Sequence, residues 1–489
     1  MTQTTEDPQQ TATPATPGRP GVAPTRRRAI GGALGLGLAG VLAGTARAAA
    51  PGPASVPGPA GAPGPEAVAA PSGSGADPAE LARIWRVAPT DLPGSSAGPW
   101  DPAWGAGGAL DGMRVAVKDL YALAGQRVGA GNPAYLAEAP VEPYSAWAVE
   151  NLAAAGARPE GIAHTDEFAY SLAGRNQAYG TPPNGLDPRR IPGGSSSGSA
   201  SAVAAGLAEI GLGTDTGGSI RVPSSYQGLF GLRTTHGLIP RDGLLPLAPS
   251  YDTVGWMARD ADAMLAATRS LAASATGAAS DDAPIRRVLV DRALMAEAEP
   301  EVAEALLREL DAARRAGAVV LEEVSTGLER RLDDWAEAFR VTQAAEAWRA
   351  WGEWVLAHAG SLSDTGRQRF ASAWGILPAQ EDEALGVVEQ ARRAIRDVVP
   401  ARACLAVPAA ATVAPLLEAT SDQEQEAREA TMRLTCLGGL SGLPIAVAPL
   451  LTGQGNGAGL GLMGSAGDDV ALVAAAGECS RAFGAPARS

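Results

Sequence analysis

Two segments in the middle of the chain combine serine and glycine in a pattern that suits acyl-transfer chemistry. They are Gly193–Ala200, which holds four serines, and Gly211–Arg221, which holds one. Glycine lets backbone N–H groups point into a cavity, and serine supplies a hydroxyl that can attack a carbonyl or relay a proton. The Gly-Gly-Ser turn at 217–219 presents consecutive N–H groups of the kind that stabilise an oxyanion.

Two other interpretations of these segments would require different neighbouring residues. Flexible linkers would not lie between apolar strand and helix patterns, and they would not carry Thr214, Asp215 and Arg221 beside the glycines. A phosphate-binding loop would end in Lys-Ser or Lys-Thr, and neither segment does. The pattern therefore favours catalysis.

A serine nucleophile needs a base, and histidine is the usual one. Gly194–Gly198 matches the G-x-S-x-G elbow of α/β-hydrolases, whose serine is paired with a histidine. The chain has three histidines, at 164, 236 and 358, and none lies in a context that marks it as a base. A Ser-His-Asp enzyme is therefore disfavoured, and another base is needed.

Lys118 is the one lysine of the chain, against 38 arginines. Arginine cannot lose its proton in a protein, whereas burial can make a lysine neutral and able to accept a proton. Lys118 ends the apolar run Met113–Lys118, which predicts a short buried strand. It is the side chain that can supply a neutral amine.

At this point the chain resembles the amidase signature family of serine hydrolases. The resemblance rests on Val115–Asp119, Gly193–Ala200, Gly211–Arg221 with the Val-Pro that follows, and Leu229–Arg233. Weaker similarity lies at Gly442–Pro444 and Gly467–Asp469. It is close over residues 110–260 and looser in the C-terminal half.

This resemblance implies a Ser-cisSer-Lys triad. By motif position, Ser219 corresponds to the nucleophile, Lys118 to the base, and Ser195 to the bridging serine, which follows a cis peptide bond after Gly194. The family's oxyanion donors correspond to the backbone N–H groups of Thr216, Gly217, Gly218 and Ser219. Thr214, Asp215 and Arg221 are expected to support this loop.

The implied activity is hydrolysis of a carboxylic amide to an acid and ammonia, without a metal or other cofactor. The sequence is similar to that of indole-acetamide hydrolases at Asp166–Tyr170, Asn176, Tyr179–Pro182 and Phe230–Arg233. This similarity suggests a small aryl- or alkyl-acetamide as the substrate. The same residues could instead have a structural role, in which they only pack against the core motifs. A peptide amidase, a glutamyl-tRNA amidotransferase A-like subunit and a non-enzymatic binding protein on the same scaffold remain alternatives.

The elements around these motifs alternate between strands and helices, which predicts an α/β fold. Helices are expected at Ser145–Ala155 and Ala200–Ala208, and a strand at Glu209–Leu212. The resemblance implies a mixed, mostly parallel central sheet covered by helices on both faces.

The second half is expected to be largely helical. Its amphipathic patterns predict helices at Pro300–Ala316, Leu328–His358 and Glu381–Val398. The pocket is expected to draw on this half, including the helix around Trp335–Trp354.

The composition limits the partners. The net charge is −14, and no basic patch follows the first fifty residues, so nucleic acid and anionic membrane are not expected partners. Cys404, Cys436 and Cys479 have no metal-ligand spacing and are expected to be free and buried. A small-molecule amide is the expected partner, and a homodimer is left open.

The N-terminal region reads as a leader followed by a linker. Arg26–Arg28, the apolar run Ile30–Gly44 and the small-x-small site Ala46–Ala48 predict a twin-arginine signal peptide over residues 1–48. Residues 49–76 are Pro-, Ala- and Gly-rich and predict a disordered linker. The amidase domain is then expected at 77–489, outside the cytoplasm and without a membrane span.

Overall fold

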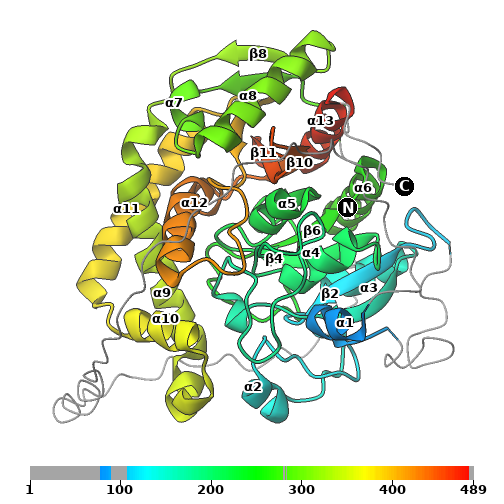
Figure 1. Cartoon of the computed structure of the whole chain (residues 1–489), viewed down its shortest axis with the longest axis vertical. Coiled ribbons are helices and arrows are strands. Elements are labelled where there is room, and N and C mark those ends of the chain that lie inside the picture. The colour runs from blue at the N-terminus through cyan, green and yellow to red at the C-terminus, as the bar shows by residue number, and fades with distance from the viewer. Residues whose placement is uncertain (1–76, 90–106, 279–280, 282, 484–489) are drawn as a thin grey trace, which may run out of the picture. The chain divides into compact units, whose positions relative to one another are not determined.

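A computed structural model describes residues 77–89, 107–278, 281 and 283–483 of the protein (Figure 1). The predicted leader and the linker over 49–76 lie outside the described residues, so their boundaries and that of the domain stay predictions. Within the described residues, no helix is long and apolar enough to cross a membrane.

The strands of the described part form one sheet, ordered β1-β3-β2-β4-β6-β5-β10-β11-β9-β7-β8. Their bounds are β1 Trp85–Val87, β2 Arg114–Lys118, β3 Arg158–Ala163, β4 Ile210–Asp215, β5 Phe230–Arg233, β6 Thr253–Ala258, β7 Arg287–Val290, β8 Val320–Glu323, β9 Ala403–Pro408, β10 Ile445–Leu451 and β11 Gly457–Met463.

The helices of the described part are α1 Pro78–Ile84, α2 Pro133–Glu138, α3 Trp147–Ala154, α4 Ser197–Ala204, α5 Arg221–Gln227, α6 Ala261–Thr276, α7 Arg292–Met295, α8 Pro300–Arg315, α9 Leu332–Ala357, α10 Asp364–Trp374, α11 Pro378–Asp397, α12 Ser421–Ser441 and α13 Asp469–Ala482. Three short 3-10 turns are η1 Glu167–Ala169, η2 Leu328–Arg331 and η3 Ala359–Ser361.

The α/β class and the mixed sheet are confirmed, but the expectation of a mostly parallel sheet is wrong. Parallel pairing is confined to β3–β2–β4 at one side and to β9–β7–β8 at the other. The strands between them pair antiparallel. One cause is the short connection between β10 and β11, because a parallel return needs a crossover of a dozen or more residues.

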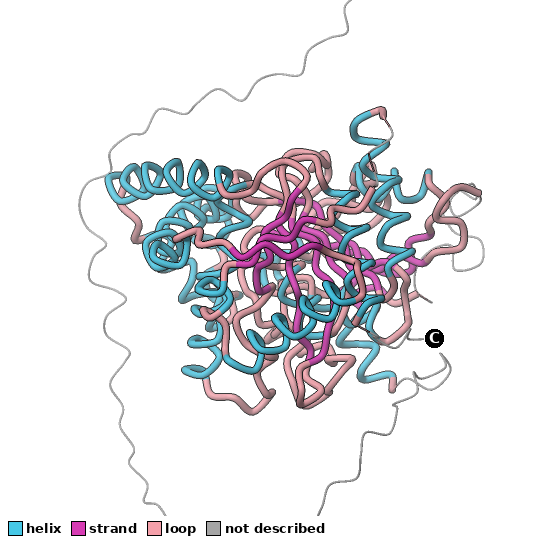
Figure 2. The backbone as a smooth tube through the Cα atoms, turned by 90° about the horizontal axis from the view of Figure 1, so that it is seen from above, coloured by secondary structure: helices cyan, strands magenta, loops and turns pink. Residues whose placement is uncertain are grey.

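The register shows that helices cover both faces of the sheet (Figure 2). Gly213 pairs with Gly255, and a Cβ at Gly213 would lie 2.5 Å from Ser196 Oγ, so this face meets the segment that opens α4. The neighbouring pair joins Leu212 and Trp256, and Trp256 donates its indole N–H to Thr268 of α6. Successive strand residues point to opposite faces, so α4 and α6 lie on opposite sides.

The predicted helices of the second half are confirmed. Pro300–Ala316 corresponds to α8, Leu328–His358 to η2 with α9, and Glu381–Val398 to α11, which begins slightly earlier at Pro378. Helices α10, α11 and α12 all pack against α9, and this helical layer is drawn in yellow to orange in Figure 1.

Candidate active site

Lys118 is the last residue of β2, between β3 and β4. Its side chain is fully buried. The Nζ atom donates to Ser195 Oγ at 2.8 Å, to Thr214 Oγ1 at 2.7 Å and to Ser196 Oγ at 3.1 Å. An apolar strand flanked on both sides by other strands thus brings the lysine to two serine–glycine segments that are distant in sequence.

Burial changes the acid–base behaviour of this lysine. Loss of water lowers the pKa of Lys118 to about 7, although the carboxylates of Asp166, Asp215 and Asp252 act to raise it. Desolvation therefore outweighs the attraction of the charged form to nearby anions. An amine with this pKa is partly neutral at neutral pH and can accept a proton.

Ser195 is fixed by its backbone as well as by Lys118. The peptide bond between Gly194 and Ser195 is cis. The Ser195 carbonyl accepts hydrogen bonds from Thr165 Oγ1 at 2.9 Å and from the Asp166 N–H at 3.3 Å. A Cβ at Gly194 would lie 2.5 Å from Asp166 Oδ2, so this close approach requires glycine.

The loop that carries Ser219 is organised by the buried carboxylate of Asp215. This carboxylate accepts bonds from the Gly218 N–H at 3.0 Å and from the Ile220 N–H at 3.3 Å. The guanidinium of Arg221 donates to both of its oxygens, at 2.9 and 2.8 Å. Burial acts to raise the pKa of Asp215, but Arg221 and Arg233 outweigh it and hold that pKa well below its usual range.

The residues expected to support the loop differ in what they contact. Asp215 and Arg221 hold the loop directly, and Arg221 also reaches the Thr435 carbonyl of α12 at 2.8 Å. Thr214 instead contacts Lys118. Ser196, the residue after Ser195, also contacts Lys118.

Arg233 was missed as a site residue. Its Nη1 donates to Asp215 Oδ1 at 3.0 Å and to the Thr216 carbonyl at 3.3 Å. The sequence signal that could have identified Arg233 was its place at the end of the Leu229–Arg233 motif. The partner of this arginine could not be known from the sequence.

The backbone donors around Ser219 are not equivalent. The Gly218 N–H is already bonded to Asp215 Oδ1. Within the described part of the chain, the N–H groups of Thr216, Gly217 and Ser219 have no acceptor. These three donors are therefore the ones that remain available to an oxyanion in this conformation.

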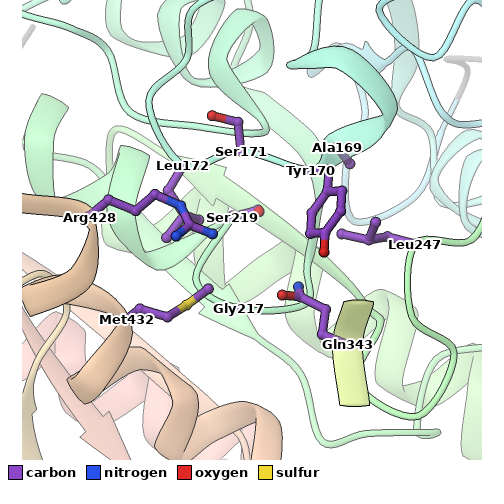
Figure 3. A pocket seen from close by; sticks show the side chains of 10 residues that line it. All are labelled: Ala169, Tyr170, Ser171, Leu172, Gly217, Ser219, Leu247, Gln343, Arg428 and Met432. Carbon is purple, nitrogen blue, oxygen red and sulfur yellow. The ribbon is translucent and has the colours of Figure 1, made fainter. Parts of the chain in front are cut away.

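Ser219 opens onto a small pocket (Figure 3). Its hydroxyl makes no hydrogen bond to any other described residue, so the contact between Ser195 and Ser219 is not made in this conformation. The pocket is lined by Ala169, Tyr170, Ser171, Leu172, Gly217, Ser219, Leu247, Gln343, Arg428 and Met432.

The wall of the pocket comes partly from the second half of the chain. Gln343 lies on α9, as expected for the Trp335–Trp354 helix, but no tryptophan is among the lining residues. Arg428 and Met432 lie one turn apart on α12 and were not identified from sequence. Thr420 caps the start of α12 by accepting the Gln423 N–H.

The histidines have other partners in the structure. His164 stacks on Tyr179 with ring centroids 4.3 Å apart, and burial lowers its pKa to about 4. His236 bonds the Pro249 carbonyl, and His358 bonds Glu138. None contacts a serine of the two motif segments.

The structure also places the cysteines and the side chains of the types that ligate metal ions. Cys404, Cys436 and Cys479 are free and buried, as predicted. Over residues 77–89, 107–278, 281 and 283–483, no group of three or more His, Cys, Asp or Glu side chains is arranged to hold a metal ion.

Comparison with known proteins gives a consistent family. The model of the Amidase family matches residues 101–473. Amidase 1 of Arabidopsis thaliana is 51% identical over 152 residues, which are 31% of this chain and 36% of that protein. The A-type subunit of glutamyl-tRNA(Gln) amidotransferase from Symbiobacterium thermophilum is 46% identical over 155 residues, 32% of this chain and 31% of that protein. The chain thus spans about a third of the length of these curated relatives.

Solved structures extend the similarity over more of the fold. A structure described as a crystal structure of amidase superposes with a TM-score of 0.67 at 28% identity, covering 77% of this chain and 86% of that one. A structure described as a vestigial protein complex that reveals the evolutionary origins of an s-triazine catabolic enzyme gives a TM-score of 0.65 at 26% identity, covering 76% of this chain and 83% of that one.

Proposed function

The chain belongs to the Amidase family of amide hydrolases, and from this premise we propose that it converts a carboxylic amide to an acid and ammonia through an acyl-enzyme on Ser219. Ser195 is the proton relay and Lys118 is the general base. The observation that carries the proposal is the buried Lys118 amine, 2.8 Å from Ser195 Oγ and with a pKa of about 7.

The proposed reaction begins with proton movement. Neutral Lys118 accepts the proton of Ser195, and Ser195 accepts that of Ser219 as the Ser219 oxygen bonds to the amide carbon. The negative charge that develops on the carbonyl oxygen is stabilised by the free N–H groups of Thr216, Gly217 and Ser219. This step requires Ser219 to rotate toward Ser195.

The second half of the reaction returns the protons. The lysine, through Ser195, protonates the leaving nitrogen, and the C–N bond breaks to release ammonia. Water then attacks the ester on Ser219, and the same relay accepts its proton. The carboxylic acid leaves, and Ser219 regains its hydrogen.

Ammonia release over a panel of aryl, aliphatic and peptide amides tests the proposal. Lys118→Arg keeps the positive charge but removes the titratable amine, so kcat/KM is expected to fall by about 10³ or more. The matched control is Arg114→Lys on the same strand, whose side chain is paired with Glu209 at the surface. Near-normal turnover by Lys118→Arg would exclude lysine as the base.

For the substrate we propose a small aryl- or alkyl-acetamide. This is supported by the modest size of the pocket and by its apolar walls of Leu172, Leu247 and Met432. A peptide amidase acting on C-terminal amides is the alternative that the same panel separates.

An amidotransferase A-like subunit is a second candidate, because curated relatives carry that name. Such a protein would depend on partner subunits. Co-purification with a tRNA-binding subunit, together with ammonia release that requires it, would favour this candidate over a free-standing amidase.

We also propose export by the twin-arginine route, on the strength of the sequence of residues 1–48. Replacement of Arg26, Arg27 and Arg28 by lysine is expected to retain the protein in the cytoplasm. Cell fractionation of the full chain measures this, and equal export of the variant would contradict it.

A further inference from the structure

Two arginines beside the pocket have no charged partner among the described residues. Arg428 of α12 lines the pocket, and Figure 3 shows its guanidinium extending toward Ser219. Arg369 of α10 lies over the ring of Tyr170, with Cζ 5.9 Å from the ring centroid. The Nε atom of Arg428 and an Nη atom of Arg369 are buried and make no hydrogen bond within the part of the chain that the structure describes.

Other arginines near the site are paired. Arg340 of α9 donates two bonds to Glu337, and Arg433 of α12 contacts both Glu297 and Asp333. Arg221 and Arg233 share the carboxylate of Asp215. Arg428 and Arg369 therefore differ from these neighbouring arginines in forming no ion pair with a described residue.

The surroundings compensate this positive charge only in part, because Glu429 attracts the charge of Arg428 and Asp166 that of Arg369 without a direct ion pair. Burial lowers the pKa of Arg428 and of Arg369, and the charge of Arg428 adds to the effect on Arg369. Arginine nevertheless stays protonated at neutral pH. Tyr170 supplies no counter-charge there, because burial raises the pKa of its phenol.

The other polar side chains of the pocket wall include two neutral ones, Tyr170 and Gln343. Tyr170 and Gln343 both point toward the pocket in Figure 3, and neither side chain has a hydrogen-bond partner among the described residues. A partly buried guanidinium without a direct ion pair loses water contacts and recovers only part of that free energy from carboxylates farther away. A carboxylate brought by a ligand would restore both, through paired N–H···O bonds.

We propose that the pocket selects amides that also carry a carboxylate, which pairs with Arg428 while the amide carbonyl lies at Ser219. This rests on the proposed function and deepens it, because it makes the substrate an anionic acetamide or a monoamide of a dicarboxylic acid. Arg369 strengthens the positive potential from behind Tyr170 and does not touch the substrate.

Matched pairs of amides test this preference. Succinamate is compared with butyramide, and 4-carboxyphenylacetamide with phenylacetamide, so that each pair differs by one carboxylate. The carboxylated member is expected to have a kcat/KM about 10- to 100-fold higher, mainly through a lower KM. Equal values for both members of each pair would overturn the proposal.

Substitution of Arg428 tests whether this arginine causes the preference for carboxylated amides. Arg428→Met is expected to reduce the ratio of kcat/KM within each pair to near one, and Arg428→Lys to restore part of it. Arg433→Met, on the same helix but with its side chain in other ion pairs, is expected to leave the ratio unchanged. A ratio that survives Arg428→Met would place the selectivity elsewhere and contradict the proposal.

A binding measurement separates this proposal from the proposed function. Succinate is titrated into wild type and into Arg428→Met by calorimetry at neutral pH, with unfolding temperature as the check that both variants fold. Arg428-dependent binding of succinate supports the anion site even if no amide is turned over. Turnover of neutral amides without such binding would leave the amidase intact and refute the anion site.

Discussion

The polar groups around Lys118 differ from those on the pocket wall formed by α9 and α12 in whether they have hydrogen-bond partners. Lys118 bonds three hydroxyls, and the Asp215 carboxylate bonds two arginine side chains and three backbone N–H groups. On the pocket wall, Gln343 and Arg428 have no such partners among the described residues.

This difference separates two tasks. A network whose donors and acceptors are satisfied keeps its geometry, which a proton relay needs. Groups without partners on a concave surface are available to a ligand, and they confer selectivity because a wrong ligand leaves them unpaired. We infer that the motif-bearing half sets the reaction and that α9 and α12 select the substrate.

The largest expected effect comes from removing the nucleophile. Ser219→Ala is expected to lower kcat/KM by about 10⁴–10⁶, the scale of losses for a nucleophilic serine. Its hydroxyl bonds no described residue, so the unfolding temperature is expected to change little. Ammonia release and labelling by a fluorophosphonate probe measure the outcome. Labelling that persists in Ser219→Ala but disappears in Ser195→Ala would reverse the two roles.

Asp215 is expected to matter most for stability. Asp215→Asn leaves the buried Arg221 and Arg233 without their shared anion, which is expected to cost about 3–5 kcal/mol of unfolding free energy. Urea unfolding followed by circular dichroism measures it. Glu209→Gln is the control, because its partner Arg114 is partly exposed and the expected loss is below about 1 kcal/mol. Equal losses would refute a special role for the Asp215 network.

The pH dependence of turnover tests the state of Lys118. Because the base must be neutral, kcat/KM is expected to rise with pH up to a pKa of about 7 and to fall tenfold per pH unit below it. The rate is measured from pH 5 to 9 with a neutral amide. A profile flat across this range would contradict the lysine base.

The same shift has a consequence for stability. The folded pKa lies below the unfolded value, so between about pH 7 and 10 the unfolded chain binds more protons at this site. The stability of wild type relative to Lys118→Met is therefore expected to rise with pH, by about 1 kcal/mol per unit. Urea unfolding of both proteins at pH 7, 8 and 9 measures the trend. A constant difference would mean that Lys118 keeps its ordinary pKa.

The smallest expected effect concerns the apolar pocket wall. Met432→Ala enlarges the pocket beside Gly217 and is expected to raise KM for small amides by about tenfold or less. Labelling by a small fluorophosphonate is expected to fall far less than in Ser219→Ala. A loss of labelling as large as that of Ser219→Ala would show that α12 also holds the reacting groups in place.

Much of the reacting centre could be predicted because its residues are unusual in type or conformation. A single lysine, serines placed between glycines, and an aspartate with an arginine six positions later stand out from any background. The short strands and the α4 helix that carry them were also predicted close to their observed bounds. The antiparallel middle of the sheet was not, since pairing direction depends on how the connections run in space.

The part of the pocket wall that α12 forms could not be predicted, for a physical reason. The sequence around Arg428 is rich in Glu, Gln and Arg, which is typical of a helix face in water. Nothing local distinguishes Arg428 from Arg433, yet one lines the pocket and the other joins an ion pair on the surface.

From the sequence alone, the resemblance to the amidase signature family named Ser219, Ser195 and Lys118 as candidates for the nucleophile, the relay and the base, and Lys118 is also the one lysine of the chain. The tertiary structure decided that Lys118 is fully buried and that Arg428 lies without a partner beside Ser219. Both properties depend on desolvation and on the positions of opposite charges, which arise only when distant segments pack together.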